Sequence, residues 1–143
     1  MSGLSSVDVV LAAFDSVERR DDARFAGLCQ PDAEFAWPPN LPYGGTVRGV
    51  SRTAREGGWS RSWDQVQPSR AERRMDPRVV AATEREVVVL WRQRGLAPAG
   101  ERFDSEVLGL YRVARSRLAR AQMFYFDPAG AAAFLARAGS PGG

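Results

Sequence analysis

Few side chains in this 143-residue chain can move a proton, because the sequence contains no histidine and a single cysteine, Cys29. The usual zinc sites and Cys-His catalytic pairs need those residue types and are therefore excluded. Proton transfer would have to use Asp, Glu, Tyr, Cys29 or an unusual Arg. Since Cys29 follows Leu28 on a short helix, we expect it to be buried and inert. We also expect no metal ion and no cofactor.

One short stretch combines rigid and aromatic residues: WPPNLPYGGTVRG, at positions 37–49. Its three prolines restrict the backbone, and its paired glycines permit the positive φ of a tight return. Trp37 and Tyr43 would then be held over the entrance to a cavity, with the Tyr43 hydroxyl as a hydrogen-bond donor. The alternative is that the loop merely joins a strand to a helix, with Tyr43 packed within the turn.

Charge and hydropathy narrow the class of protein. The net charge is +3 and the chain has no lysine, but acids alternate with the arginines in stretches such as EREVVVLWRQR and ERFDSEVLGLYR. That mixture is typical of the solvated face of strands, so we expect no nucleic-acid partner. No apolar run approaches the roughly 20 residues of a membrane span, and the first residues lack the features of a signal peptide. We therefore expect a cytoplasmic protein with no membrane partner.

The first part of the chain is predicted to be mostly helical. Apolar residues at helical spacing indicate a first helix with Ser5 as its N-cap, and a second short helix is capped by Asp21 or Asp22. The alternating segment AEFAW, at residues 33–37, predicts a strand. After the proline-rich loop, a third helix is predicted over residues 51–63.

The second part is predicted to be mostly extended. Strands are expected over 66–75, 78–94, 101–113 and 117–126. Asp127 then N-caps a final helix that Gly139 ends. Helices followed by a long antiparallel meander indicate an α+β fold, a cone-shaped barrel in which a curved sheet wraps the N-terminal helices and leaves a cavity. We expect a single domain over residues 1–139 and a disordered tail over residues 140–143.

This order of elements, together with three motifs, resembles a known family. The motifs are PYGGTVRG, PAGERFDSEVLGLYRV and FYFDPAGAAAFL. They resemble the SnoaL-like branch of the nuclear transport factor 2-like superfamily, which includes polyketide cyclases, ketosteroid isomerases and limonene-type epoxide hydrolases. The resemblance covers nearly the whole chain. It is specific for the fold and weak for the reaction, because one scaffold hosts many chemistries.

The catalytic groups that the resemblance implies are missing at the matching positions. Ketosteroid isomerases use a tyrosine and a protonated aspartic acid as an oxyanion hole and an aspartate as the base. A reading without gaps places Ala13, Gly109 and Trp37 at those positions. The relay of the epoxide hydrolases is absent too: its approximate positions hold Arg92, Leu90, Phe124, Phe35 and Trp37. Phe124 also occupies the position of the acid that the cyclases use.

The replacements would give a cavity lined by large aromatic rings and suited to a flat apolar ligand. The expected ligand-binding residues are Phe14, Phe35, Trp37, Trp59, Trp63, Ser105, Gly109, Tyr111, Gln122 and Phe124. In this interpretation Gly109 lies opposite Phe124 and leaves a vacant patch on the cavity floor. Alternation puts Ser105 and Tyr111 on the face of Gly109, and Gln122 on that of Phe124. The same aromatic residues could instead simply fill the core.

Three residues are candidates for catalysis: Tyr43, Arg92 and Asp104. Tyr43 would donate a hydrogen bond at the cavity mouth. Arg92, in a relay-like position, could hold an anionic or enolate oxygen, or could point outward. Alternation turns Asp104 outward, paired with Arg102 or with a neighbouring strand, unless a bulge resets the register.

Two classes of function follow from these expectations. The first is a biosynthetic enzyme, by resemblance a cyclase or isomerase that folds an apolar, polyketide-like substrate in secondary metabolism and donates a few hydrogen bonds to it. The second is a ligand-binding or dimeric assembly module without turnover, which the missing acids would suit. Leu108 and Leu110 are expected on the outward face of the sheet, with Val88 and Leu90 as possible neighbours, so we expect a homodimer.

Overall fold

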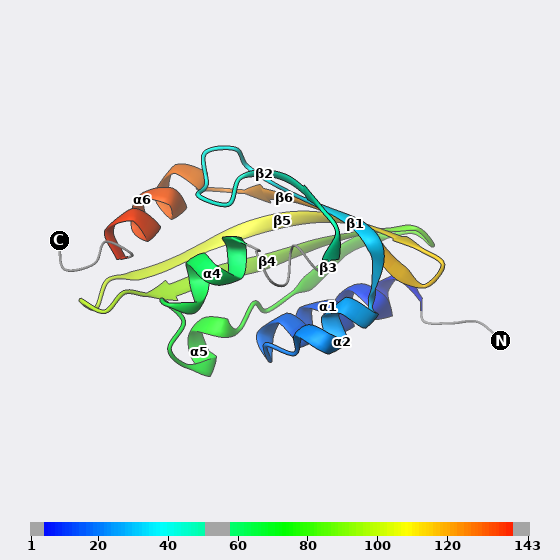
Figure 1. The fold of residues 1–143 in the computed structure, drawn as a ribbon, viewed down its shortest axis with the longest axis horizontal. Coiled ribbons are helices and arrows are strands. Elements are labelled where there is room, and N and C mark those ends of the chain that lie inside the picture. The colour runs from blue at the N-terminus through cyan, green and yellow to red at the C-terminus, as the bar shows by residue number, and fades with distance from the viewer. Residues whose placement is uncertain (1–4, 51–57, 139–143) are drawn as a thin grey trace.

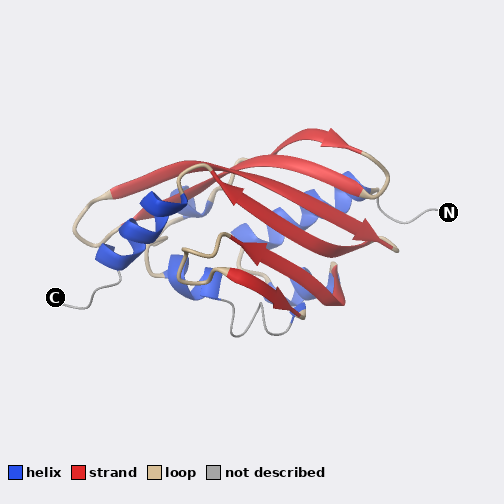
Figure 2. Ribbon diagram, turned by 90° about the horizontal axis from the view of Figure 1, so that it is seen from above, coloured by secondary structure: helices blue, strands red, loops and turns tan. Residues whose placement is uncertain are grey.

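The computed structural model describes residues 5–50 and 58–138. Its strands form one curved sheet in the order β2-β1-β6-β5-β4-β3 (Figures 1 and 2). The strands are β1 (Cys29–Trp37), β2 (Gly45–Arg48), β3 (Arg78–Ala82), β4 (Glu86–Leu96), β5 (Arg102–Ala114) and β6 (Arg117–Tyr125). Neighbours are antiparallel except β1 and β6, which run parallel.

The helices are α1 (Ser6–Glu18), α2 (Asp22–Gly27), α4 (Gly58–Asp64), α5 (Arg70–Arg73) and α6 (Pro128–Ala138). The first four lie on one side of the sheet, and α6 lies at the end of the sheet opposite the N-terminus (Figure 1). α1 packs against β3, β4, β5 and β6. The α+β fold with a curved sheet around helices is confirmed, and the sheet does not close into a complete barrel.

Predicted helix ends agree with the capping residues in the structure. The backbone N–H of Asp8 donates to the Ser5 hydroxyl over 3.1 Å, which starts α1 where the sequence indicates. Asp21, of the two candidates, caps α2. Asp127 accepts a hydrogen bond from the N–H of Gly130 over 2.9 Å and precedes the proline that begins α6. Each contact satisfies a donor that the first turn of a helix leaves free.

The extended segments were predicted less well. Residues 66–75 do not form a strand: Ser69 and Glu72 form a capping box that starts α5 instead. The segment 78–94 is a hairpin of β3 and β4, because Thr83 accepts from the N–H groups of Arg85 and Glu86 and turns the chain. A further strand, β2, was not expected from the sequence; it pairs with β1 inside the proline-rich region.

Two further expectations concern residues that are not described. The predicted third helix covers residues 51–63, of which the structure describes only the part that forms α4. The predicted disordered tail, residues 140–143, lies outside the described residues. Within the described ranges, no helix is long and apolar enough to cross a membrane.

Candidate functional site

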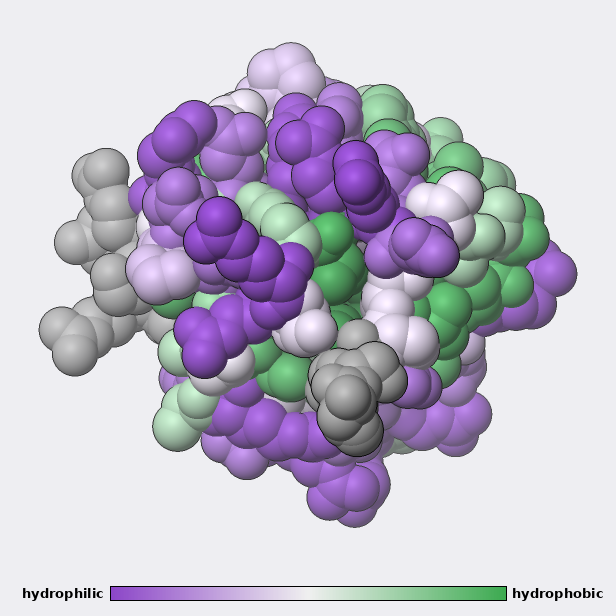
Figure 3. Space-filling view, turned by 90° about the vertical axis from the view of Figure 1, so that its right-hand side faces the viewer, coloured by the Kyte–Doolittle hydropathy of each residue, from purple (hydrophilic) through white to green (hydrophobic). Residues whose placement is uncertain are grey.

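A cavity lies between the inner face of the sheet and helices α1, α2 and α4. About 820 Å³ of space that no protein atom fills lies there, a volume that includes solvent outside the open mouth. Its wall contains Val10, Ala13, Phe14, Val17, Asp22, Phe25, Phe35, Trp37, Trp59, Ser60, Met75, Trp91, Tyr111, Leu118, Ala121 and Met123. Seen from one end, the protein surface is largely hydrophilic, with hydrophobic residues showing between the polar ones (Figure 3).

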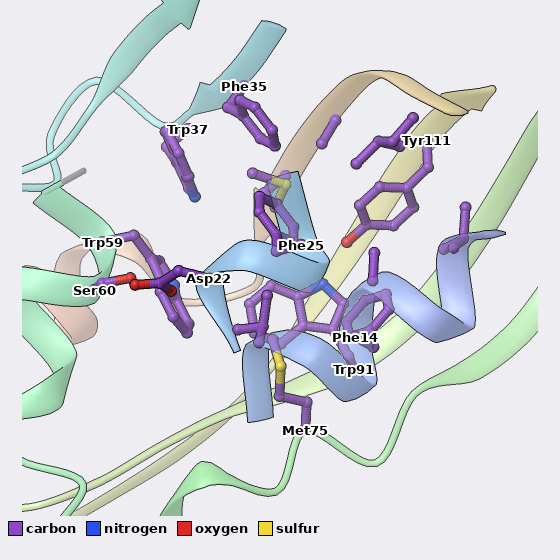
Figure 4. Close-up of a pocket in the computed structure, with 16 residues that line it drawn as sticks. Phe14, Asp22, Phe25, Phe35, Trp37, Trp59, Ser60, Met75, Trp91 and Tyr111 are labelled. Atoms are coloured by element: carbon purple, nitrogen blue, oxygen red, sulfur yellow. The ribbon is translucent and has the colours of Figure 1, made fainter. Parts of the chain in front are cut away.

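Seven of the sixteen residues in the cavity wall are aromatic, and their rings come from separate elements (Figure 4). Phe14 of α1 meets Trp91 of β4 edge to face at 5.9 Å between ring centroids, and Tyr111 of β5 at 5.6 Å. On the other side, Phe35 and Trp37 of β1 stack at 6.1 Å. These rings hold one another in place, so the hollow has rigid, apolar walls.

The polar groups inside the cavity are chiefly hydrogen-bond donors. Trp91 is 3% exposed, and its indole nitrogen has no hydrogen-bond partner among the described residues. The Tyr111 hydroxyl points toward that nitrogen, and the indole nitrogen of Trp37 points into the cavity from the opposite wall (Figure 4). Burial raises the pKa of Tyr111 above its ordinary value, an effect that the nearby Trp91 indole partly offsets, so this hydroxyl is protonated at neutral pH.

A carboxylate lies only at the mouth of this cavity. Among the described lining residues Asp22 is the one acid, and it is exposed beside Ser60 and the Trp59 ring (Figure 4). Arg20 covers Trp59 from outside, with its guanidinium carbon 5.5 Å from the ring centroid. No three acidic or cysteine side chains of the described residues lie together where they could hold a metal ion.

The other half of the interior contains a continuous chain of side-chain hydrogen bonds. The Trp63 indole donates to the Tyr43 hydroxyl over 2.9 Å, and the hydroxyls of Tyr43 and Tyr125 are 2.7 Å apart. Tyr125 donates to Gln93 Oε1 over 3.1 Å, and Trp59 donates to the same oxygen over 2.9 Å. Because the Tyr125 proton goes to Gln93, Tyr43 must donate to Tyr125. All five side chains are buried.

Helix α6 seals this half of the interior. Phe134 of α6 stacks on Trp63 at 6.1 Å, and Phe103 of β5 leans on both rings, at 5.5 Å from Phe134 and 5.8 Å from Trp63. Phe134 is 1% exposed and Trp63 is fully buried. The packing leaves no access to the hydrogen-bonded chain from this end of the sheet.

Five of the expected aromatic ligand-binding residues line the cavity, and Tyr111 is one of them. Phe14, Phe35, Trp37 and Trp59 line the cavity, whereas Trp63 does not. Trp63 shares a helix face with Trp59, as the spacing predicts, but it lies one turn further on and reaches the cluster under α6. Tyr43 is also buried in the hydrogen-bonded chain, so it is not a donor at the cavity mouth. Burial raises its pKa well above the ordinary value.

Arg92 and Asp104, the other two catalytic candidates, lie on the outer face of the sheet. Arg92 Nε is 2.7 Å from Asp104 Oδ1, and Arg94 contacts the same carboxylate at 3.4 Å. Neither Arg92 nor Asp104 lines the cavity. The alternation that turned Asp104 outward therefore holds, and its partners are on β4 rather than at Arg102.

The prediction for β6 was wrong by one residue. Gln122 and Phe124 face outward: Phe124 is 47% exposed, and Gln122 accepts a hydrogen bond from Arg120 over 2.7 Å. Met123 and Tyr125 of the same strand face inward instead. Both alternating sets contain an aromatic residue, so alternation alone does not decide which set is buried.

The expectation that Gly109 lies opposite Phe124 and leaves a vacant patch on the cavity floor was also wrong. Gly109 faces inward, but it pairs with Met123, not with Phe124. A Cβ atom at this glycine would lie 2.2 Å from the Tyr111 hydroxyl oxygen, so the Tyr111 side chain already fills the space. Ser105 is on the same face, half-buried opposite Gln93, and does not line the cavity.

Sequence reasoning missed Phe25, Met75 and Trp91 as cavity residues. A signal for Trp91 was present, because it alternates with Val87 and Val89, which are both fully buried in β4. Phe25 was placed on the second helix without a role. Cys29 is buried as expected, but it begins β1 and does not lie on the helix. Burial raises the pKa of its thiol to about 12.

The comparisons with known proteins agree on the fold. The model of the SnoaL-like domain family matches residues 10–121. The structure of TerC co-crystallised with polyporic acid is similar, with a TM-score of 0.71 at 17% identity over 87% of this chain and 93% of that one. An NTF2-like protein from Burkholderia thailandensis gives 0.72 at 18%, over 97% of this chain and 100% of that one.

A protein of unknown function with a cystatin-like fold, from Xanthomonas campestris, gives a TM-score of 0.73 at 18% identity, over 92% of this chain and 98% of that one. The search of curated proteins gives no match. The structural neighbours share the curved sheet and its helices at low identity, and the family model covers well over half of the sequence. The chain therefore belongs to the SnoaL-like domain family.

Proposed function

We propose that this protein binds a flat, apolar, polyketide-like molecule in the cavity and acts on it as a cyclase or isomerase in secondary metabolism. The observation that carries the proposal is the cavity itself: an open hollow with rigid aromatic walls and donors directed inward. If these aromatic residues simply filled the core, no cavity would remain between them. Membership of the SnoaL-like family, which includes polyketide cyclases and isomerases, supports the same class.

One structural neighbour also supports a small-molecule ligand. TerC was co-crystallised with polyporic acid. At 17% identity the likeness concerns the fold, so the ligand of this chain must be argued from its own cavity. That cavity favours planar molecules, because stacked rings such as Phe35 and Trp37 offer flat apolar faces.

Catalysis would depend on positioning and on one carboxylate. Cyclisation by aldol chemistry and double-bond isomerisation both begin with removal of a proton from a carbon next to a carbonyl group. Asp22 is the acid among the described residues that line the cavity, so it would accept that proton and return it to another carbon or to solvent. The aromatic walls would fix the conformation of the substrate.

A second function, ligand binding without turnover, is favoured by the position of Asp22. This acid is exposed at the mouth, and the described interior of the cavity contains no other carboxylate. An exposed carboxylate is a weaker base toward carbon than a buried one. The two candidates share the ligand and differ in whether it is changed.

Exchange of carbon-bound protons separates the two functions. We would incubate the protein with 2-tetralone in deuterium oxide and follow loss of the proton signals next to the carbonyl by NMR. An enzyme accelerates the exchange above the buffer rate, and Asp22→Asn lowers that acceleration at least tenfold. Binding of the ketone without acceleration would support the binding module.

Binding itself is tested by filling the hollow. Ala121→Phe places a ring in the cavity wall and should weaken binding of fluorene, a flat tricyclic hydrocarbon, at least tenfold in equilibrium dialysis. Ala133→Phe, an exposed change on α6, is the matched control and should leave binding unaltered. If fluorene does not bind the wild-type protein at all, the proposed ligand class is wrong.

We also propose a homodimer through the outer face of the sheet. Val88, Leu90, Leu108 and Leu110 are partly exposed there, and Phe124 joins them. A continuous apolar strip of this kind is typical of an interface. Light scattering should give the mass of a dimer at micromolar concentration, and Leu108→Arg should give a monomer. A monomeric wild-type protein would contradict the proposal.

A further inference from the structure

The floor of the cavity contains a buried donor without a partner and, beside it, a tyrosine hydroxyl. Trp91 is buried, and its indole N–H has no hydrogen-bond partner in the part of the chain that the structure describes. The Tyr111 hydroxyl points at the same spot (Figure 4). A buried N–H without a partner is uncommon, because the group has lost its hydrogen bond to water and has gained no bond within the protein. A ligand that enters the cavity could supply the missing hydrogen-bond partner of this N–H.

The surroundings show which partner fits. The rings that pack on this spot belong to Phe14 and Tyr125, which meet Trp91 edge to face at 5.9 and 6.3 Å. Tyr125 donates its proton to Gln93 and accepts from Tyr43, and within the described residues no hydrogen bond joins it to Trp91. An indole N–H can only donate, whereas a tyrosine hydroxyl both donates and accepts. The missing partner is therefore a hydrogen-bond acceptor.

We propose that Trp91 and Tyr111 form a recognition site for an oxygen acceptor, the carbonyl of a flat aromatic ketone whose rings occupy the rest of the cavity. This inference rests on the binding part of the proposed function, since it specifies which apolar ligands the cavity prefers. A carbonyl held on the floor keeps its neighbouring carbons away from Asp22 at the mouth, so the inference applies to binding without turnover. The ketone enters with its oxygen toward the sheet, and its rings lie between Phe35 on one side and Phe14 on the other. Trp37, whose indole nitrogen also points inward, lies near the opposite end of the ligand (Figure 4).

The arrangement makes the pair a determinant of specificity. A hydrocarbon of the same shape would gain the contacts with the rings but would leave the Trp91 N–H without a partner. A ketone gains the same contacts and two hydrogen bonds. Sites built to hydrogen-bond a ligand reject analogues that lack the matching group more strongly than apolar pockets reject a change in size.

The experiment compares two ligands that differ in one group. 9-Fluorenone and fluorene share the same three flat rings, and only fluorenone has a carbonyl oxygen. Dissociation constants are measured by equilibrium dialysis for the wild-type protein, Trp91→Phe, Tyr111→Phe and the double variant. We expect the wild type to bind fluorenone at least fivefold more tightly than fluorene. Each single variant should reduce this preference about threefold, and the double variant should abolish it while its affinity for fluorene stays within about twofold.

A matched control separates recognition from general loss of packing. Phe25→Leu trims the apolar wall, so it should weaken both ligands by the same factor and keep the preference. A second measurement follows the wild-type protein: the indole N–H signal of Trp91 in a nitrogen-15 NMR spectrum should move further downfield with fluorenone than with fluorene. Trp91→Phe identifies the signal by its absence.

The outcomes distinguish the inference from the proposed function. If neither ligand binds, the proposed function fails. If both bind with equal affinity, or if the preference survives in the double variant, the cavity takes flat apolar molecules and the recognition site is overturned. A Trp91 signal that responds equally to both ligands would overturn it as well.

Discussion

The two halves of the interior use the same residue types to opposite effect. Under α6, Trp63 and Tyr125 belong to a chain in which the indole and hydroxyl groups each have an acceptor, and Phe134 closes the packing. Between α1 and the sheet, Trp91 and Tyr111 border a hollow, and the Trp91 N–H has no partner within the described residues. The contrast shows how to interpret a buried tryptophan or tyrosine. When its polar group has a hydrogen-bond partner in the protein, the residue belongs to the core, and when it has none, the residue indicates a binding site.

We call the first region the sealed half, formed by Tyr43, Trp63, Gln93, Tyr125 and Phe134, and the second the open half, formed by Phe14, Trp91 and Tyr111. Gln93 is the residue that makes the sealed half complete. Its side-chain oxygen accepts from Trp59 and Tyr125 together, and an indole N–H can face only an acceptor. Among the described residues the indole N–H of Trp91 has no such hydrogen-bonded acceptor, although the Tyr111 hydroxyl lies near it.

The largest difference between the halves should appear when a ring is removed. Phe134→Ala deletes a side chain that is 1% exposed and stacked on Trp63, so it should lower the free energy of unfolding by about 3–5 kcal/mol. Phe25→Ala deletes a half-buried ring that already borders the hollow and should cost about 1–2 kcal/mol. Urea unfolding at pH 7 measures both. Equal losses would mean that the open half is packed as tightly as the sealed one.

A smaller difference is expected when a methyl group is added at a glycine. In the sealed half, the new Cβ of Gly95→Ala would lie 2.7 Å from Phe134 Cε2 and 3.2 Å from Trp63 Cζ3, between rings that have nowhere to move. We expect a loss of about 1–3 kcal/mol in urea unfolding. In the open half, Gly109→Ala pushes against the far end of the Tyr111 side chain, which can shift into the cavity.

Gly109→Ala should therefore cost less stability, about 1 kcal/mol or below, and more affinity. Because the shifted tyrosine occupies ligand space, the dissociation constant for 9-fluorenone should rise severalfold, whereas Gly95→Ala should leave it unchanged. Equilibrium dialysis and urea unfolding on the same preparations provide the test. A Gly109→Ala protein that is as unstable as Gly95→Ala, with unaltered binding, would show that Tyr111 cannot move.

Much of the fold could be predicted from sequence because its signals are local. Ser5, Asp21 and Asp127 each cap a helix where a polar side chain precedes an apolar periodic segment. The long strands of the meander follow from period-two alternation. The prediction was wrong where two local signals competed, as at Ser69 and Glu72, whose capping box gave a helical turn within a segment taken as extended.

The site was harder to predict because it depends on which face of a strand is buried. Met123 and Tyr125 face inward and Gln122 and Phe124 outward, and either choice buries one aromatic residue of β6. The decision comes from pairing with β5 and from the partner that Tyr125 finds in Gln93, a residue 32 positions earlier. Contacts of that kind have no local signature. The same holds for Tyr43, whose partner Tyr125 lies 82 positions away.

The smallest expected effect is the most direct test of the contrast, because it removes one oxygen atom from each half. Tyr125→Phe leaves the Tyr43 hydroxyl without its acceptor and takes one donor from Gln93, so it should lower the free energy of unfolding by about 1–2 kcal/mol at pH 7. Tyr111→Phe removes a hydroxyl that reaches only toward the unpaired Trp91 N–H and should cost less than about 0.5 kcal/mol.

Alkaline pH supplies the control for this pair, because burial acts on both tyrosines. Burial raises the pKa of Tyr111 and of Tyr125 above the ordinary value of 10.0. The stabilisation from a raised tyrosine pKa is fully present below about pH 10 and is lost as pH rises toward the folded-state pKa, at about 1.4 kcal/mol per pH unit for each tyrosine. Both variants should therefore make this alkaline loss shallower by the same amount, although only Tyr125→Phe is destabilising at pH 7. If Tyr111→Phe were equally destabilising at pH 7, the Tyr111 hydroxyl of the wild-type protein would be hydrogen-bonded within the protein as strongly as that of Tyr125. The open half would then have no hydrogen-bonding group left for a ligand.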